Sequence, residues 1–133
     1  MVNRPLISVV DDDGSVRKSF QRLIRSVGFG VEVFASAEEF LKSEHLHSTD
    51  CLILDVRMPG INGLELQREL AAGGCEIPVI FITAHGDEAA RSQALKEGAV
   101  AYLLKPFREE TLLKAINMVL NSDDDQANQH RSR

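Results

Sequence analysis

The stretch that decides the fold of this chain is Cys51-Leu52-Ile53-Leu54-Asp55, followed by Val56-Arg57-Met58-Pro59-Gly60. Its apolar run is short, ends at a carboxylate and is bounded by Pro and Gly, which is typical of a buried strand that opens into a loop. Asp55 is therefore predicted to lie at the carboxyl end of a strand. Open α/β sheets bind their ligands outside the carboxyl ends of the strands. Polar residues at the ends of the other strands thus become candidates for function.

Four further strands are predicted around this one, and helices separate them. Apolar, β-branched runs predict these strands over residues 6–10, 31–34, 78–82 and 99–104. Apolar positions at helical spacing lie between them, and Gly28, Gly73-Gly74 and Gly98 supply helix stops. This alternation implies right-handed crossovers and a parallel sheet that is covered on both faces. The expected fold class is α/β, a single doubly wound five-stranded parallel sheet in the flavodoxin-like order 2-1-3-4-5.

Helix starts are predicted from capping residues. Ser36 and Glu39 form a capping box for a helix that is expected to run to about Leu46. Asn62-Gly63 is predicted to begin the helix after the central strand, and Asp87 is predicted to cap the helix that Gly98 ends.

Length and composition indicate one domain, followed by a tail. The chain has 133 residues, of which 44% are hydrophobic, enough for one layered core. Residues 1–121 are expected to form this domain. Residues 122–133 have no apolar face to bury, so they are predicted to form a flexible tail or interdomain linker.

Charge and hydropathy limit the functional classes. Every apolar run is far shorter than the roughly 20 residues of a membrane-spanning helix, and residues 1–5 lack a signal-peptide pattern. We therefore expect a cytoplasmic protein without membrane contact. A net charge of -5 argues against direct nucleic-acid binding by this stretch. Cys51 and Cys75 lack metal-type or redox-type spacing and are expected to be reduced thiols.

Polar side chains follow the carboxyl ends of four predicted strands. Asp11 and Asp12 follow the first strand, and Asp55 ends the third. Thr83 follows the fourth strand, and Lys105 follows the fifth. Because the carboxyl ends of parallel strands share one edge of the sheet, we expect these side chains to converge on one pocket.

The chemistry of this pocket indicates a divalent cation and phosphoryl transfer. Neighbouring carboxylates raise each other's pKa unless a cation is present, and hard oxygen ligands suit Mg²⁺ rather than Zn²⁺. With Mg²⁺ held by the acid pair, Asp55 is a candidate carboxylate nucleophile. Lys105 is a candidate to neutralise charge on the phosphoryl oxygens, and Thr83 is a candidate to donate its hydroxyl to them.

Taken singly, each of these features has a simpler interpretation. An Asp-Asp-Asp-Gly run is usually a solvated turn, and Asp13 is assigned to that turn. Lys105-Pro106 could be an ordinary loop, Thr83 a β-branched strand end, and His85 a loop residue near the pocket rather than a catalytic base. The joint placement at matched strand ends favours the functional interpretation.

The same residues carry a family resemblance. Over residues 5–121 the chain resembles the receiver domain of bacterial two-component response regulators, which has a CheY-like fold. It looks most like the FixJ-type branch, in which a helix-turn-helix DNA-binding domain follows the receiver. Four segments stand in the family order: Val9-Val10-Asp11-Asp12-Asp13, Leu54-Asp55-Val56-Arg57-Met58-Pro59-Gly60, Ile82-Thr83-Ala84 and Leu104-Lys105-Pro106-Phe107.

The resemblance implies roles for individual residues. Asp55 would accept a phosphoryl group from the phosphohistidine of a sensor histidine kinase. Asp11, Asp12, Asp55 and the backbone carbonyl of Arg57 would hold Mg²⁺. Lys105 would contact the phosphate through a cis Lys105-Pro106 turn.

It also implies a switch and its tuning. Thr83 and Tyr102 would form the switch, and Arg57 and His85 would tune the lifetime of the phosphoryl group. Tyr rather than Phe at position 102, and Gly14 after the acidic run, are the departures from the family pattern.

The expected output is a change in self-association. Phosphorylation would produce a homodimer through the fourth helix, fifth strand and fifth helix, and would control transcription through a domain after the tail. Such a protein catalyses its own phosphorylation and dephosphorylation but is a signalling switch rather than an ordinary enzyme. Two alternatives remain: a protein-binding receiver module that works without phosphorylation, and a Mg-dependent aspartyl-phosphate phosphatase.

Overall fold

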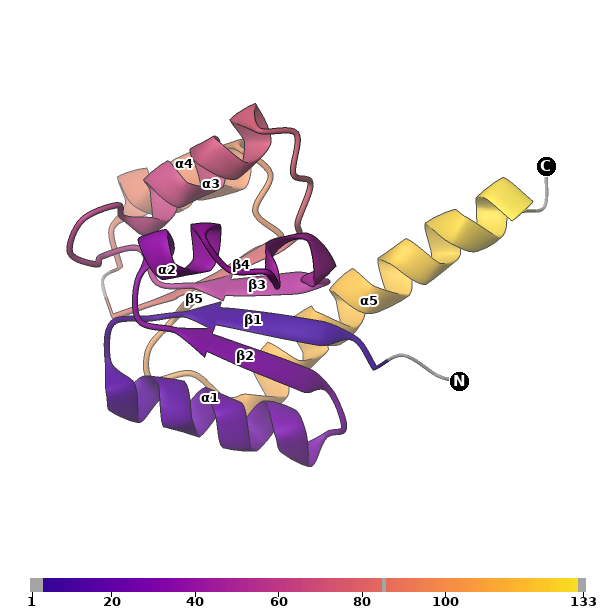
Figure 1. Cartoon of the computed structure of the whole chain (residues 1–133), viewed down its shortest axis with the longest axis horizontal. Coiled ribbons are helices and arrows are strands. Elements are labelled where there is room, and N and C mark those ends of the chain that lie inside the picture. The colour runs from indigo at the N-terminus through magenta and orange to yellow at the C-terminus, as the bar shows by residue number, and fades with distance from the viewer. Residues whose placement is uncertain (1–3, 85, 132–133) are drawn as a thin grey trace.

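A computed structural model describes residues 4–84 and 86–131, with side chains described as far as residue 121. Five parallel strands form one sheet in the order β2-β1-β3-β4-β5, as predicted (Figure 1). The strands are β1 (Leu6–Val10), β2 (Gly30–Phe34), β3 (Cys51–Leu54), β4 (Val79–Thr83) and β5 (Ala101–Leu104). The helices are α1 (Gly14–Ser26), α2 (Ala37–Leu41), α3 (Gly63–Ala72), α4 (Glu88–Lys96) and α5 (Glu109–Arg131), and a 3₁₀ turn, η1 (Leu46–Ser48), precedes β3.

The helices form two layers, one on each face of the sheet (Figure 1). Successive side chains of β3 point to opposite faces because a strand has a period of two. Ile53 therefore packs in the cluster that includes α1 and α5, and Leu54 packs in the cluster that includes α2, α3 and α4. All four residues of β3 are buried, which is expected of a central parallel strand.

Helix α2 is shorter than predicted, because it ends at Leu41 rather than near Leu46. Polar side chains beyond it bond to the backbone and compete with the helix. The Ser43 hydroxyl accepts the N–H of His45 (2.9 Å), and the Thr49 hydroxyl donates to the carbonyl oxygen of His45 (2.7 Å). These bonds fold the segment into a turn and η1, which leads the chain back to β3.

Helix α5 is longer than predicted, because its backbone stays helical to Arg131. Its last turns extend beyond the sheet (Figure 1). The sequence predicted a flexible tail from Ser122, but no Gly or Pro follows that residue to stop the helix. The division into a receiver domain and a linker stays a prediction.

The connections at the carboxyl edge are tight. The Lys105-Pro106 peptide bond is cis, as predicted. Gly63, the first residue of α3, has no room for a side chain, because a β-carbon there would collide with the backbone oxygen of Asp55. The loop after β3 is thus held closely against the start of α3.

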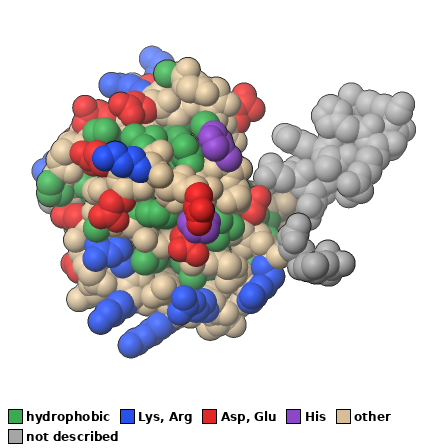
Figure 2. Space-filling view, in the orientation of Figure 1, with side chains coloured by type: hydrophobic (Ala, Val, Ile, Leu, Met, Phe, Trp, Pro, Cys, Tyr) green, Lys and Arg blue, Asp and Glu red, His purple; other side chains and the backbone are tan. Residues whose placement is uncertain are grey.

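Charge is unevenly spread over the surface. Helix α1 carries four basic and no acidic residues, and Figure 2 shows Lys and Arg side chains along the side of the molecule that α1 occupies in Figure 1. Lys18, Arg22 and Arg25 are exposed there. The net negative charge therefore lies on other elements. Among the described residues, no helix combines the length and apolar character that crossing a membrane requires.

Candidate functional site

Three carboxylates meet at the carboxyl edge of the sheet. Asp11 follows β1 and Asp55 follows β3, and both are buried, whereas Asp12 is exposed. One oxygen from each lies within 4.8 Å of the others. The backbone fixes this edge, because Asp11 donates its N–H to the Phe34 carbonyl and Asp55 donates its N–H to the Val10 carbonyl, each at 3.1 Å. The predicted convergence of the acid residues is confirmed.

Lys105 brings a positive charge to two of these carboxylates. Its Nζ lies 2.9 Å from Asp11 Oδ2 and 3.2 Å from Asp55 Oδ2. The backbone N–H of Lys105 donates to the Thr83 carbonyl oxygen (2.8 Å), which joins the ends of β4 and β5. The ammonium group of Lys105, at the fifth strand end, thus bridges the carboxylates at the first and third strand ends.

The pKa values show how these charges are balanced. Burial raises the pKa of Asp55 above its ordinary value of 3.8, and the negative charge of Asp11 adds to this, whereas Lys105 opposes it. Burial by itself lowers the pKa of Lys105, but the hydrogen bond to Asp11 and the charges of both carboxylates outweigh it, so the pKa is raised. Lys105 therefore stays charged, and Asp55 remains incompletely compensated.

The donor set fits a hard divalent cation. Three carboxylates that share one small space repel each other, and Lys105 contacts two of them. Asp11 also uses its other oxygen, because Oδ1 accepts the backbone N–H of Asp13 (2.9 Å). Oxygen ligands of this kind, with one residue open to water, are what Mg²⁺ prefers.

The predicted switch residues lie on neighbouring strands and on the same face of the sheet. Thr83 is the last residue of β4 and is fully buried. In the pairing of β4 with β5, Phe81 is opposite Tyr102 and Thr83 is opposite Leu104. Tyr102 is half-buried, and its ring centroid lies 6.0 Å from that of Phe81. Burial, together with the charge of Asp87, raises the pKa of Tyr102.

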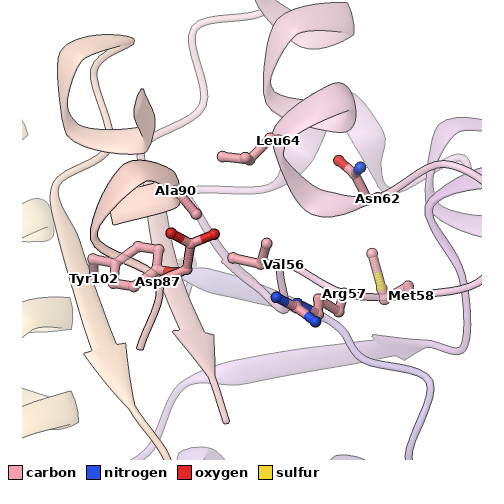
Figure 3. Close-up of a pocket in the computed structure, with 8 residues that line it drawn as sticks. All are labelled: Val56, Arg57, Met58, Asn62, Leu64, Asp87, Ala90 and Tyr102. Atoms are coloured by element: carbon pink, nitrogen blue, oxygen red, sulfur yellow. The ribbon is translucent and has the colours of Figure 1, made fainter. Parts of the chain in front are cut away.

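Arg57 flanks the pocket, and its backbone N–H donates to Asp55 Oδ1 (3.3 Å). Its exposed side chain lines a cavity of about 310 Å³ between the β3–α3 loop and α4 (Figure 3). The role of its carbonyl oxygen as a metal ligand stays a prediction. His85, predicted to tune the site, lies outside the described residues.

Sequence reasoning missed two residues that shape the site. Asp13 is the N-cap of α1 rather than only a turn residue, because its Oδ1 accepts the N–H of Ser15 (2.9 Å). Arg17, one turn later, donates from its guanidinium to the carbonyl oxygen of Asp11 (2.8 Å). The spacing of Asp13 before the apolar face of α1 was a usable capping signal, whereas nothing in the sequence indicated the contact of Arg17.

The comparisons with known proteins agree with this geometry. The chain is 50% identical over 113 residues to nodulation protein W of Bradyrhizobium diazoefficiens, covering 85% of this chain and 50% of that protein. It is 39% identical to the transcriptional regulatory protein FixJ of Azorhizobium caulinodans, over 96% of this chain and 60% of that protein. This chain thus spans between a half and three fifths of the length of these relatives.

A solved structure shows the same fold. The structure of the response regulator StyR matches with a TM-score of 0.84 and 46% identity, covering 97% of this chain and 66% of that one. The family model described as the response regulator receiver domain matches residues 7–117. The strand order, the edge of acid residues and these matches agree, and the chain belongs to the response regulator receiver domain family.

Proposed function

We propose that this chain accepts a phosphoryl group on Asp55 from the phosphohistidine of a sensor histidine kinase. The observation that carries the proposal is the bridge of Lys105 between Asp11 and Asp55 at 2.9 and 3.2 Å, next to a third carboxylate. Among the described residues, Lys105 is the only cationic side chain bonded to these carboxylates. A phosphoryl group on Asp55 would bring negatively charged oxygens next to it, and this supports the proposal.

The reaction is a displacement at phosphorus. An oxygen of the Asp55 carboxylate forms the new P–O bond while the P–N bond to the kinase imidazole breaks, and the imidazole leaves with the bonding electron pair. Lys105 turns from the carboxylates to the phosphoryl oxygens and holds them. The Thr83 hydroxyl donates a hydrogen bond to one of these oxygens.

Asp11, Asp12, Asp55 and the carbonyl oxygen of Arg57 would hold Mg²⁺. A bound Mg²⁺ would supply charge neutralisation on the phosphoryl oxygens. The raised pKa of Asp55 supports this assignment, because a buried carboxylate beside Asp11 lacks full compensation from Lys105 alone.

Labelling with a small phosphodonor tests the proposal. Incubation with acetyl phosphate and Mg²⁺ should add one phosphoryl group by mass, and Asp55→Asn should abolish the adduct. Asp50→Asn is the matched control, since Asp50 is an exposed carboxylate that precedes the same strand. An adduct that persists in Asp55→Asn would overturn the assignment. No adduct on the wild type would favour a binding module that works without phosphorylation.

Metal removal gives a separate prediction. Chelation should abolish labelling, and Mg²⁺ should raise the unfolding temperature of the wild type because it binds only the folded site. Asp12→Ala should weaken this stabilisation about tenfold or more in Mg²⁺ concentration, given the loss of one carboxylate ligand. Calorimetry at increasing Mg²⁺ concentration measures the unfolding temperature of both proteins. If the unfolding temperatures of the wild type and of Asp12→Ala rise equally with Mg²⁺, the metal assignment is contradicted.

The output is a phosphorylation-dependent homodimer through α4, β5 and α5, which controls transcription through a domain after the tail. Two observations support it. The printed name of the FixJ relative is that of a transcriptional regulatory protein, and this chain covers 60% of it. Two elements of this face also carry exposed large apolar side chains, Leu104 on β5 and Met118 on α5. The net charge of -5 supports the view that this part does not itself bind DNA, and a cytoplasmic location follows from the proposed kinase partner.

A further inference from the structure

Two of the three clustered carboxylates, those of Asp11 and Asp12, belong to neighbouring residues. In an extended strand, successive side chains point to opposite sides. Here one oxygen of each nevertheless lies within 4.8 Å of the other and of an Asp55 oxygen. The backbone makes this possible because it leaves β1 after Val10 and bends at Asp12. Bringing both carboxylates to one site therefore depends on whatever holds this bend.

Arg17 is bonded to the residues on both sides of the bend. Its backbone N–H donates to the carbonyl oxygen of Asp13 (3.0 Å), and its guanidinium Nη1 donates to the carbonyl oxygen of Asp11 (2.8 Å). Arg17 lies on α1, one turn before Phe20, which is fully buried in the core. The bend at Asp12 is thus tied to a helix that the core holds in place.

The guanidinium holds the backbone without occupying a carboxylate. Among the described residues, Arg17 forms no ion pair with a carboxylate, whereas Lys105 contacts both Asp11 and Asp55. Gly14 leaves room beside the guanidinium, because even a β-carbon there would lie 3.4 Å from Nη2 of Arg17. The contact of Arg17 therefore leaves the carboxylate oxygens to other partners, a bound cation among them.

We propose that Arg17 is a positioning residue of the metal site. By holding the carbonyl oxygen of Asp11, it keeps the Asp11–Asp12 peptide in the bend that presents both carboxylates to one cation. Arg17 acts through these two residues and does not itself contact the metal. The inference rests on the proposed function for the identity of the cation, Mg²⁺. Loss of a group that orients metal ligands typically weakens metal binding about 10- to 100-fold.

The charge of Arg17 by itself has the opposite effect on Mg²⁺ binding. A guanidinium near the site repels a divalent cation, so its removal would strengthen binding if charge alone mattered. A purely structural role would lower the unfolding temperature and leave the affinity for Mg²⁺ unchanged. Only a positioning role predicts that the loss of a positive charge weakens the binding of a cation.

A Mg²⁺ titration followed by amide chemical shifts around Asp55 tests the sign. Arg17→Met keeps an unbranched side chain but removes the donor, and it should need about tenfold more Mg²⁺ for half-saturation than the wild type. Arg22→Met is the matched control, because Arg22 is exposed on the same helix and its loss removes the same charge. It should need no more Mg²⁺ than the wild type. Equal or tighter binding in Arg17→Met would overturn the proposal, and so would an equal loss in both variants.

Hydrogen exchange in the metal-free protein tests the bend by itself. The N–H of Asp13 donates to Asp11 Oδ1 (2.9 Å), so its exchange reports whether the bend is intact. In Arg17→Met this amide should exchange about tenfold faster than in the wild type, and in Arg22→Met it should exchange at the rate of the wild type. An unchanged rate in Arg17→Met would overturn the proposal.

The two experiments also separate this proposal from the proposed function. If the wild type neither responds to Mg²⁺ nor forms the acetyl phosphate adduct, it is the proposed function that fails. The exchange rate of the Asp13 amide then decides whether Arg17 holds the bend.

Discussion

At the scale of single residues, the site is a balance of buried charges. Asp55 has a raised pKa because it is buried and faces Asp11, and Lys105 compensates for only part of this. A carboxyl group whose pKa is raised in the folded state weakens folding at neutral pH, where it is charged. Asp55, the residue proposed to accept the phosphoryl group, therefore lowers the free energy of unfolding, although the proposed function requires it.

Asp55→Asn should therefore stabilise the protein without Mg²⁺. At pH 7 we expect a gain of roughly 1 kcal/mol in the free energy of unfolding, because the repulsion from Asp11 is lost while Lys105 keeps Asp11. The pKa of Asp55 in the folded protein lies above 3.8. Below pH 3.8 Asp55 is protonated in both states and does not lower the stability of the wild type, whereas this stability falls as pH rises through the folded pKa. Urea unfolding in a chelator should show the advantage of the variant shrinking as pH falls. A variant that is less stable at pH 7 would contradict this balance.

Gly63 lies so close to the backbone of Asp55 that no side chain fits there. A β-carbon at this position would collide with the backbone oxygen of Asp55 and lie 3.0 Å from the Phe81 ring. Gly63→Ala should destabilise the fold by about 1–3 kcal/mol and slow the labelling of Asp55. Gly14→Ala is the control, because its β-carbon would meet only the end of the Arg17 side chain at 3.4 Å. Equal unfolding midpoints in urea for the two variants would show that the β3–α3 loop moves away from the added methyl group without loss of stability.

Site residues could be predicted from the sequence where a reactive side chain lies at the end of a predicted strand. Asp11, Asp12, Asp55, Thr83 and Lys105 all lie at the predicted edge. It could not reveal Arg17 or the closeness of Gly63 to Asp55, because both depend on how a helix packs after a tight turn. Such contacts arise from three-dimensional spacing and leave no pattern in the chain.

At the scale of elements, strands and helix starts were predictable, whereas some helix ends were not. Asn62 and Asp87 cap their helices as expected, because a side-chain oxygen before an apolar face is a local signal. The end of α2 depends instead on bonds that Ser43 and Thr49 make beyond the helix. The extent of α5 depends on the lack of a stop signal after Ser122, where the absence of an apolar face suggested a tail.

The cap of α1 can be tested directly. Asp13→Ala should destabilise the protein by about 1 kcal/mol, because the N–H groups of Ser15 and Val16 lose their acceptor. Asp13→Asn keeps a side-chain oxygen at the cap and should restore most of this loss. Thermal unfolding of both variants provides the measurement. If Asn fails to restore stability, the charge of Asp13 rather than its cap would be the relevant property.

At the scale of the whole molecule, the edge of acid residues and the face of α4, β5 and α5 are joined through β4 and β5. Thr83 ends β4, and the adjacent strand carries Tyr102. A phosphoryl group contacts only a few groups, so a distant effect requires an element with two arrangements. Moving such an equilibrium from 1:99 to 99:1 takes about 5.5 kcal/mol, which a few charge-assisted hydrogen bonds of roughly 1.5–3 kcal/mol each can supply.

The proposed dimer face gives the last prediction. Leu104 on β5 is 51% exposed and Met118 on α5 is 58% exposed, and the proposed two-fold contact would bury apolar side chains of this kind. Sedimentation should show a monomer without beryllofluoride and a dimer with it.

Leu104→Glu should abolish this dimer and leave the acetyl phosphate adduct on Asp55 intact, because a charge buried in the contact lacks a partner. Val27→Glu is the matched control, since Val27 is 43% exposed at the end of α1, an element that is not part of this face. Thr83→Ala should also prevent dimerisation, by removing the hydroxyl that detects the phosphoryl group. A dimer that persists in Leu104→Glu but is lost in Val27→Glu would place the contact near the end of α1 instead.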